Sequence, residues 1–493
     1  MLTELNWIIK RAAMSPTHTA LVNVHSDEHW TYKKLIGRIS FWRNVFTTEG
    51  LSKGDRIAVL SPNHPELFAI LFACGLDGYI YVPLNWRFSV HELQYVIGDC
   101  QPSYIVFDEL MEDVANQLSV STSRSLSNSD ATVQEVFQSS VELKPEDPWL
   151  LIYTGGTTGN PKGVILSFEA VNCNSINTII SWGLTEEDTT INYMPLFHTG
   201  GINALSLPIL MAGGTVVIGN RFDADMALRA TDRYEATISL FVPTMYQQMI
   251  QENYFKQSSF PSMKVFLSGG APCPQTIYNR FTERGFKFKE GYGLTEAGPN
   301  NFFIRPELAE TKKGSVGKSM IFNSVKVVDE EGNPCGPGEV GELYLSGKHI
   351  FTAYWNKPLE TSAAFDDGWL KTGDLAKFDE DGDYYIVGRK KEMIISGGEN
   401  IYPQEVEQCL IHFLGIREAA VVGIPDEKWG ESVTAFIVLD DGIEYEEEAL
   451  LIHCRKYLGS YKVPKKIVIL SELPKTHVGK IDKKKLQAFE PSR

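Results

Sequence analysis

Three features that would place the chain in other protein classes are missing. Its seven cysteines are odd in number and scattered, without the paired spacing of disulfides or zinc ligands, which favours a reduced, cytoplasmic compartment. No segment reaches the uninterrupted ~20 apolar residues that a membrane helix needs. Met1–Pro16 carries Glu4, Lys10 and Arg11 and lacks a long apolar stretch, so it is not predicted to be a signal peptide.

The chain also lacks a surplus of basic over acidic residues. The chain has 46 Lys and Arg against 62 Asp and Glu, a net charge of −16. This argues against general nucleic-acid binding, which needs a basic face. A length of 493 residues exceeds what one core usually supports, so two or more domains are expected, and 43% hydrophobic residues are typical of a globular protein.

Apolar runs alternate with segments of helical spacing over the first two thirds of the chain. Strands are predicted at 57–60, 79–82, 104–107, 215–218, 237–242 and 263–267, and helices at 65–76, 89–97, 202–211, 223–234 and 244–252. The alternation predicts an α/β fold with mostly parallel, doubly covered sheets and ligands at the carboxyl ends of the strands. The Ser-rich segment 119–142 is interpreted as a surface excursion.

The sequence pattern changes from about residue 314, where long helical segments give way to short apolar runs. Short apolar runs and closely spaced turns over 314–388 predict a β-rich subdomain. The charged tetrapeptide 389–392 is interpreted as a hinge. We therefore expect a large domain over 1–390 and a small, mobile α+β domain over 391–493. Within the second, helices are expected at 404–413 and 445–458 and strands at 419–424 and 433–439.

A glycine-rich and hydroxyl-rich loop stands between two apolar runs, Leu150–Ile152 and Val164–Leu166. It reads Tyr153-Thr154-Gly155-Gly156-Thr157-Thr158-Gly159-Asn160-Pro161-Lys162-Gly163. Backbone N–H groups at glycines, Thr hydroxyls and a Lys are what a polyphosphate needs. The loop is not a Walker A motif, because Pro161 and Gly163 flank the Lys where that motif requires Gly and Ser or Thr.

Two further motifs favour an aromatic base and a metal ion. Ser268-Gly269-Gly270-Ala271-Pro272 follows an apolar strand and permits close approach of a flat ring, although alone it is also typical of a tight turn. In Gly291-Tyr292-Gly293-Leu294-Thr295-Glu296, Tyr292 can stack on a base, and Thr295 and Glu296 offer oxygen ligands to Mg²⁺. Alone, this motif is more often a plain loop.

The last two motifs supply charged groups. Asp374, in Lys371-Thr372-Gly373-Asp374-Leu375, can accept both hydroxyls of a ribose or simply cap its own turn. Arg389 follows the next apolar run and can reach the same sugar or a phosphate. Lys480 lies beside Gly479 in a basic tail, where a solvated side chain is the ordinary alternative.

Together and in this order, the five motifs resemble those of the ANL superfamily of adenylate-forming enzymes, in its acyl-CoA synthetase branch. The resemblance covers almost the whole chain. One departure is Gly155, where many members carry Ser, so one hydroxyl donor is lost. The resemblance implies an ATP-dependent ligase that activates a carboxylic acid as acyl-AMP, releases pyrophosphate and transfers the acyl group to coenzyme A.

The resemblance also implies roles for individual residues. ATP would be held by Thr154, Gly155, Gly156, Thr157, Thr158, Gly159, Lys162, Gly270, Ala271, Tyr292, Gly293, Asp374 and Arg389. Thr295 would meet the α-phosphate, and Glu296 with Thr154 would bind Mg²⁺. Lys480 would bridge the acid and the α-phosphate, and Lys391 would be the hinge about which the C-terminal domain rotates.

For the second half reaction, the resemblance implies that Gly397, Gly398, Glu399 and Trp429 face coenzyme A, and that His198 lies between the acyl pocket and the thiol tunnel. A helix-start histidine in an ordinary turn is the alternative for His198. The acyl pocket is predicted to be lined by Phe197, Thr199, Gly200, Phe241, Ser268, Gly269 and Leu294. No charge in these stretches is dedicated to a second carboxylate, which favours a fatty or aryl monocarboxylate.

Other functions stay open on the sequence alone. They are an o-succinylbenzoate–CoA ligase, an enzyme that loads a carrier protein in trans, a nucleotide-binding regulator without turnover and, least favoured, a luciferase-like oxygenase. The expected partners are small molecules, namely the acid, ATP and coenzyme A, with no nucleic acid and no integral membrane segment. A homodimer is an open prediction.

Overall fold

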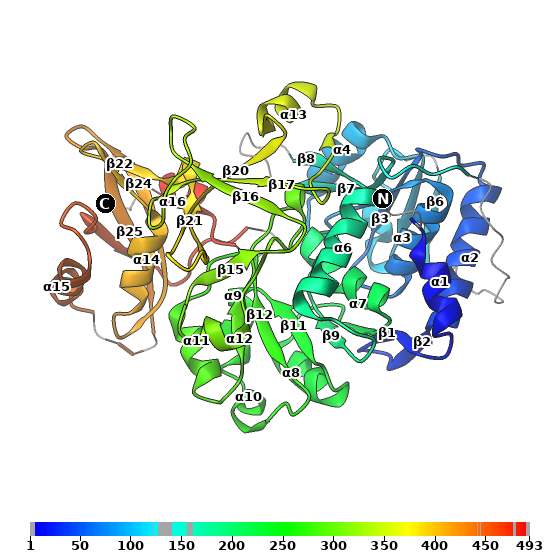
Figure 1. The fold of residues 1–493 in the computed structure, drawn as a ribbon, viewed down its shortest axis with the longest axis horizontal. Coiled ribbons are helices and arrows are strands. Elements are labelled where there is room, and N and C mark those ends of the chain that lie inside the picture. Colours follow the sequence, from blue (N-terminus) through cyan, green and yellow to red (C-terminus); the bar gives the residue numbers. More distant parts are fainter. Residues whose placement is uncertain are drawn as a thin grey trace.

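The structure, a computed structural model, describes residues 5–120, 122–126, 141–154, 161–440, 442–443, 445–476 and 480–489. It has the predicted two-domain, mixed α/β architecture, with two large, mostly parallel sheets, a β-rich region and a small C-terminal unit. The C-terminal unit lies at one end of the long axis, and α1 (Trp7–Met14) and α2 (Tyr32–Thr48) lie toward the other (Figure 1).

The first sheet is parallel except for its last pair of strands. Its order is β13 (Phe288–Glu290), β12 (Val265–Ser268), β11 (Ile238–Phe241), β9 (Thr189–Asn192), β10 (Thr215–Ile218), β1 (Thr19–Asn23) and β2 (Glu28–Thr31). Short, apolar, β-branched runs such as 215–218 suit strands that are covered on both faces. The predicted strands in this region are confirmed to within one or two residues.

The second sheet is parallel in its centre and ends in an antiparallel hairpin. Its order is β18 (Ala353–Tyr354), β8 (Lys162–Ser167), β7 (Pro148–Thr154), β4 (Ile80–Pro83), β3 (Arg56–Leu60), β5 (Tyr104–Phe107) and β6 (Ser123–Ser125). Strand β6 lies in the segment expected to be only a surface excursion. Of that segment, residues 121 and 127–140 lie outside the described residues.

Helices cover both sheets, and several begin at polar caps that the sequence carries. Ser89 and Glu92 form a capping box at α4 (Val90–Cys100), and Ser167 and Asp223 cap α6 (Phe168–Trp182) and α8 (Ala224–Arg233). The other helices of the large domain are α3 (Glu66–Asp77), η1 (Glu109–Met111), α5 (Glu112–Ala115), η3 (Gly200–Ala204), α7 (Ser206–Ala212), α9 (Pro243–Met249), α10 (Asn253–Gln257), α11 (Gln275–Thr282), η4 (Thr295–Ala297), α12 (Pro306–Ala309) and α13 (Pro358–Ala364).

The single helix predicted over 202–211 is instead two pieces, the π-helical turn η3 and then α7. The carbonyl of Gly201 accepts hydrogen bonds from Asn192 Nδ2 and Ser206 Oγ, each at 2.8 Å. These side-chain bonds draw that carbonyl away from the regular helical pattern, and π-turns of this kind occur frequently at functional sites.

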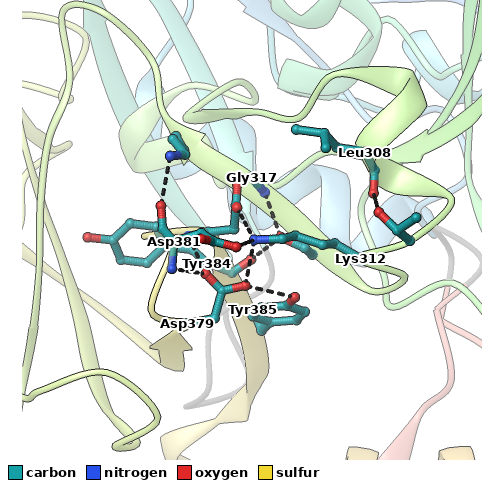
Figure 2. A network of polar contacts seen from close by, with 11 residues as sticks. Leu308, Lys312, Gly317, Asp379, Asp381, Tyr384 and Tyr385 are labelled. Carbon is teal, nitrogen blue, oxygen red and sulfur yellow. Dashed lines mark hydrogen bonds and ion pairs between the residues drawn. The ribbon is translucent and has the colours of Figure 1, made fainter.

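The β-rich region is an antiparallel sheet ordered β14 (Phe302–Phe303), β15 (Ser315–Ser319), β21 (Tyr384–Arg389), β20 (Trp369–Phe378), β17 (Gly341–Ser346) and β16 (Ser324–Val328), with β19 (Phe365–Asp366) on β20. The turn between β20 and β21 is tied down by Lys312, whose Nζ lies 2.9, 2.7 and 2.5 Å from carboxylate oxygens of Asp379, Asp381 and Asp383 (Figure 2). Lys312 is therefore the cation of this acidic cluster.

After η5 (Lys390–Glu392) the C-terminal unit forms its own sheet and core. Its strands are β23 (Glu399–Ile401), β22 (Ile394–Ser396), β25 (Gly430–Leu439), β24 (Ile416–Asp426) and β26 (Lys466–Ile469), and its helices are α14 (Pro403–Ile411), α15 (Glu447–Tyr457) and α16 (Lys483–Gln487). Its separate apolar clusters match the predicted small α+β unit. In the described part of the chain, no helix is long and apolar enough to cross a membrane.

Candidate active site

The predicted phosphate loop connects two paired strands. Thr154, at the end of β7, is the register partner of Lys162, at the start of β8, and both are half-buried. The Lys162 ammonium lies 5.2 Å from the centre of the Tyr354 ring. Gly155, Gly156, Thr157, Thr158 and Gly159 lie outside the described residues, so their phosphate-binding roles stay predictions.

Tyr292, Asp374 and Arg389 meet in what we call the Asp374 corner. The Tyr292 hydroxyl donates to Asp374 Oδ2 at 2.6 Å, and Arg389 Nε lies 2.8 Å from Asp374 Oδ1. Antiparallel pairing places Asp374 directly opposite Arg389 across β20 and β21. Three groups predicted from separate motifs are thus joined by direct contacts.

The Asp374 carboxyl is strongly shielded, with 4% of the residue exposed. Burial raises its pKa, and the opposing effects of Arg389, Tyr292 and Lys480 favour the charged form. The Thr372 hydroxyl donates to Leu343 O at 2.7 Å and accepts from Asp374 N at 3.0 Å, which fixes the turn. Thr372 is a positioning residue to which the sequence analysis assigned no role.

Glu296, the predicted magnesium ligand, lies in η4 beside the buried Thr295. Its Oε1 accepts from the Tyr354 hydroxyl at 2.8 Å, and its backbone carbonyl accepts from Phe351 N at 2.8 Å. Tyr354 therefore touches both Lys162 and Glu296. The sequence analysis missed Tyr354, because no motif surrounds it and it reaches the site by pairing β18 onto β8.

Lys480 belongs to the C-terminal unit, and its charge acts on Asp374. Thr476 N donates to Lys480 O at 2.7 Å, and Lys480 N donates to Thr476 Oγ1 at 3.3 Å. Burial of its ammonium and then the charge of Arg389 lower the pKa of Lys480, while Asp374 and Glu392 raise it. These four charges therefore interact across the two domains.

His198 lies on the turn that enters η3, and the charge of Lys480 acts on it. Burial, followed by the positive charges of Lys480 and Arg87, lowers the pKa of His198 to about 3. Its Nε2 is shielded from solvent and has no hydrogen-bond partner among the described residues. His198 is therefore neutral at physiological pH and has one ring nitrogen without a partner.

The acyl-pocket residues divide into two groups. Phe197, Thr199 and Gly200 lie on the turn that carries His198 and enters η3, while Gly269 and Leu294 follow β12 and β13. Phe241 instead packs in an aromatic core, with its ring centre 5.5 Å from that of Tyr246. Ser268, the register partner of Phe241, is fully buried. This placement does not support a pocket role for Phe241, whose neighbour Leu240 faces the other side of β11.

The glycines predicted to frame adenine are required for different structural reasons. Gly270 has a φ of +81°, which favours glycine over other residues. A Cβ on Gly293 would lie 2.2 Å from the carbonyl carbon of Pro299, so close backbone packing requires glycine there. The binding roles of Gly270, Ala271 and Gly293 stay predictions.

The four predicted coenzyme A residues come together in the C-terminal unit. Gly397 and Gly398 form the turn between β22 and β23, with positive φ values of +64° and +86°. Gly397 N donates to Trp429 O at 2.8 Å, and Glu399 begins β23. Trp429 is 40% exposed, and Lys465 Nζ lies 3.7 Å from its ring centre. This group is an accessible surface.

Comparison with known proteins agrees with this geometry. Residues 8–355 match the AMP-binding enzyme family, and residues 405–480 match the AMP-binding enzyme C-terminal domain. A feruloyl-CoA synthase of Amycolatopsis is 36% identical over 97% of this chain and 96% of its own, and an indoleacetate–CoA ligase of Aromatoleum aromaticum is 34% identical over the same shares.

Among solved structures, the o-succinylbenzoate–CoA synthetase of Bacillus subtilis, in complex with its acyl-adenylate intermediate, is 30% identical with a TM-score of 0.91 over the whole of both chains. The chain belongs to the AMP-binding enzyme family of the ANL superfamily. Within it, the chain is an AMP-forming acid–thiol ligase that uses ATP, Mg²⁺ and coenzyme A.

Proposed function

We propose that this ligase activates a largely apolar monocarboxylic acid, fatty or aryl, and that Lys480 and the Asp374 corner carry the adenylation step. The observation that supports this most strongly is the geometry of the Asp374 corner, where the Tyr292 hydroxyl lies 2.6 Å and Arg389 Nε 2.8 Å from the carboxylate. The charge of Lys480, from the C-terminal unit, counteracts the burial that raises the pKa of that carboxyl. The names of the relatives agree, since ferulate and indoleacetate are aryl acids.

The chemistry explains why a lysine is needed at this point. The acid's carboxylate attacks the α-phosphate of ATP, so a P–O bond forms to the acid as the bond to pyrophosphate breaks. Two anions about 4 Å apart repel by roughly 4 kcal/mol at an effective dielectric of about 20. An ammonium between them offsets much of this repulsion, and each ~1.4 kcal/mol is tenfold in rate.

The remaining roles are those that the resemblance to the family implies. Asp374 would accept the ribose hydroxyls while Arg389 and Tyr292 hold it in place, and Thr295 would meet the α-phosphate. Glu296 and Thr154 would hold Mg²⁺, since a half-buried carboxylate and a hydroxyl at this edge suit a hard cation. When bound, Mg²⁺ neutralises charge on the phosphates.

We propose a domain boundary at residues 390–391, with rotation about Lys391 between the half reactions. Lys390 is anchored to Glu342 at 2.7 Å on the large-domain side, and Lys483 contacts Glu392 at 3.3 Å on the C-terminal side. Lys391 therefore stands between two anchored neighbours. Rotation would bring Gly397, Gly398, Glu399 and Trp429 to the acyl-adenylate, with His198 beside the thiol path. A cytoplasmic location and a homodimer remain proposals.

The test is a mass-spectrometric screen. The purified protein is incubated with Mg-ATP and a panel of short, medium, long and aryl acids, with and without coenzyme A. We expect acyl-CoA and AMP from one acid class and bound acyl-AMP when coenzyme A is omitted. Acyl-AMP that ignores coenzyme A would instead support a carrier-protein acceptor, and no adenylate with any acid would contradict the proposal.

A further inference from the structure

The strands β7 and β8, which flank the predicted phosphate loop, are packed tightly next to two predicted ATP ligands. Thr154 pairs with Lys162, and the adjacent pair in the ladder is Tyr153 with Gly163. Tyr153 is 8% exposed, and a Cβ on Gly163 would lie 3.1 Å from Tyr153 Cζ. The tyrosine ring therefore lies directly against the backbone of β8, and whatever holds this pair also places its neighbours.

The pair belongs to a group that we call the Asp99 cluster, which consists of Asp99, Tyr153, Gly163 and Trp355. The Tyr153 hydroxyl donates to Asp99 Oδ2 at 2.6 Å. Burial raises the pKa of this hydroxyl, so it keeps the proton that it donates. Trp355 Nε1 donates to Asp99 O at 3.1 Å, and Trp355 N donates to Gly163 O at 2.7 Å. These three hydrogen bonds connect β7 to β8 through Asp99 and Trp355.

The end of α4 that carries Asp99 is anchored independently of the cluster. Arg56, at the start of β3, donates from Nε to Cys100 O at 2.9 Å and from Nη2 to Gln101 O at 2.6 Å. Its guanidinium carbon also lies 5.8 Å from the centre of the Trp355 ring. Asp99 is therefore held by its own helix end and can serve as a fixed point for the two strands.

The cluster is also connected to the predicted magnesium ligand. Trp355 directly follows Tyr354, whose hydroxyl donates to Glu296 and whose ring centre lies 5.2 Å from Lys162 Nζ. Tyr354 pairs with Val164 in the ladder between β18 and β8. Any shift of Trp355 would therefore be passed to Tyr354, which touches both the lysine and the carboxylate.

We propose that Asp99 is a positioning residue for the β- and γ-phosphates of ATP. Through its hydrogen bonds it fixes the spacing of Thr154 and Lys162, which are predicted to hold those phosphates. The proposal rests on the proposed function, because it takes the phosphate-binding role of that pair as given. Groups that are already held in place lose less freedom when a ligand binds. Because Asp99 acts through the pair, its effect should be confined to nucleotides that carry these two phosphates.

The experiment compares the binding of Mg-ATP and of AMP by isothermal titration calorimetry, without acid or coenzyme A. AMP lacks the β- and γ-phosphates and reports on the rest of the nucleotide site. Tyr153→Phe removes one hydrogen bond and keeps the ring, so Kd for Mg-ATP should rise about three- to tenfold while Kd for AMP stays within about twofold. Asp99→Ala should match Tyr153→Phe, whereas Asp99→Asn, whose amide oxygen can still accept, should keep most of the wild-type affinity.

A double-variant cycle separates positioning from a general loss of stability. Because Tyr153→Phe and Asp99→Ala remove the same bond, the double variant should bind Mg-ATP no worse than either single variant. The matched control is Tyr254→Phe, which removes a tyrosine–aspartate bond of 2.8 Å to Asp232 between α10 and α8. It should change neither affinity. Thermal midpoints are measured for every variant.

Equal weakening of Mg-ATP and AMP binding would overturn the inference, as would unchanged Mg-ATP affinity in Tyr153→Phe. Lys162→Ala tests the assumption on which the inference rests, and it should weaken Mg-ATP binding while sparing AMP. If Lys162→Ala has this effect and Tyr153→Phe does not, the inference fails and the proposed function stands. If Lys162→Ala weakens neither or both, the phosphate-binding role of the pair fails and the inference fails with it. Failure of every acid to form acyl-AMP would instead defeat the proposed function.

Discussion

In the Asp374 corner, the carboxylate accepts from Tyr292 and pairs with Arg389, whereas on the turn before η3 the Nε2 of His198 has no hydrogen-bond partner among the described residues. The corner is charged, bonded and built from groups that hold one another in place before any ligand arrives. The turn Phe197–Gly200 carries only apolar or neutral side chains and contains this unpaired ring nitrogen. This difference is what we expect if the corner binds a fixed reactant, ATP, and the turn faces acids that vary.

The largest effect is expected from Lys480→Ala, which removes the charge that acts next to the corner. Loss of one preorganised charge should slow acyl-adenylate formation by about 10²- to 10³-fold. Thioester formation from supplied acyl-adenylate should stay near wild type, as single-turnover assays of each half reaction would show. Lys475→Ala, five residues from Lys480 in sequence but paired with Glu418, is the matched control. Equal loss in both half reactions would contradict the rotating-domain assignment.

Asp374→Asn keeps the shape of the corner and removes its negative charge. Arg389 then loses its ion pair, and a ribose loses a charged acceptor. We expect KM for ATP to rise by about tenfold, as loss of one charge-assisted hydrogen bond predicts, with little change in KM for the acid. Steady-state kinetics with each substrate varied would check this. If KM for the acid rises more than KM for ATP, the assignment of the corner to ATP is contradicted. Asp381→Asn, in the exposed part of the Lys312 cluster, is the control.

Lys391→Pro tests whether the C-terminal domain rotates about this residue between the two half reactions. A proline fixes φ at the hinge, so domain rotation should slow and the thioester step should fall about tenfold more than adenylation. Lys391→Ala, which keeps backbone freedom, should leave the ratio of the two steps unchanged. Unaltered turnover in the proline variant would remove Lys391 as the hinge.

Tyr354→Phe deletes the hydroxyl that orients Glu296 and keeps the ring beside Lys162. We expect kcat/KM for Mg-ATP to fall by about three- to tenfold, the value of one hydrogen bond. A shift in the Mg²⁺ concentration needed for half-maximal rate would accompany it. Tyr457→Phe, on an exposed ring of α15, should have no effect. Wild-type magnesium dependence in Tyr354→Phe would exclude the orienting role.

The smallest expected effect is on stability and concerns the protonation of His198. Because its pKa is lowered to about 3, the folded protein keeps it neutral, whereas the unfolded chain binds a proton below its ordinary value near 6.5. Its contribution to stability is present above pH 6.5 and is lost as pH falls toward 3. His198→Gln should therefore lose less unfolding free energy than wild type between pH 7.5 and 5, measured by denaturant titration. Equal losses would contradict a neutral His198.

Much of the fold could be predicted because its strands are short apolar runs bounded by turn residues, as at 104–107 and 215–218. The Asp374 corner was also accessible, since each member lies in a recognisable motif. Tyr354 was not, because it reaches Glu296 only through pairing of β18 with β8, a long-range contact without local signal. The side of the sheet that Phe241 faces likewise depends on strand packing, which the residue type does not reveal.

The most direct test of the comparison measures KM for ATP and kcat/KM for the acid across one panel of acids with the wild-type protein. The account predicts that KM for ATP stays within about threefold while kcat/KM for the acids spans 10²-fold or more. If KM for ATP changes with the acid as strongly as acid specificity does, the two sites are not separate in function and the account is contradicted.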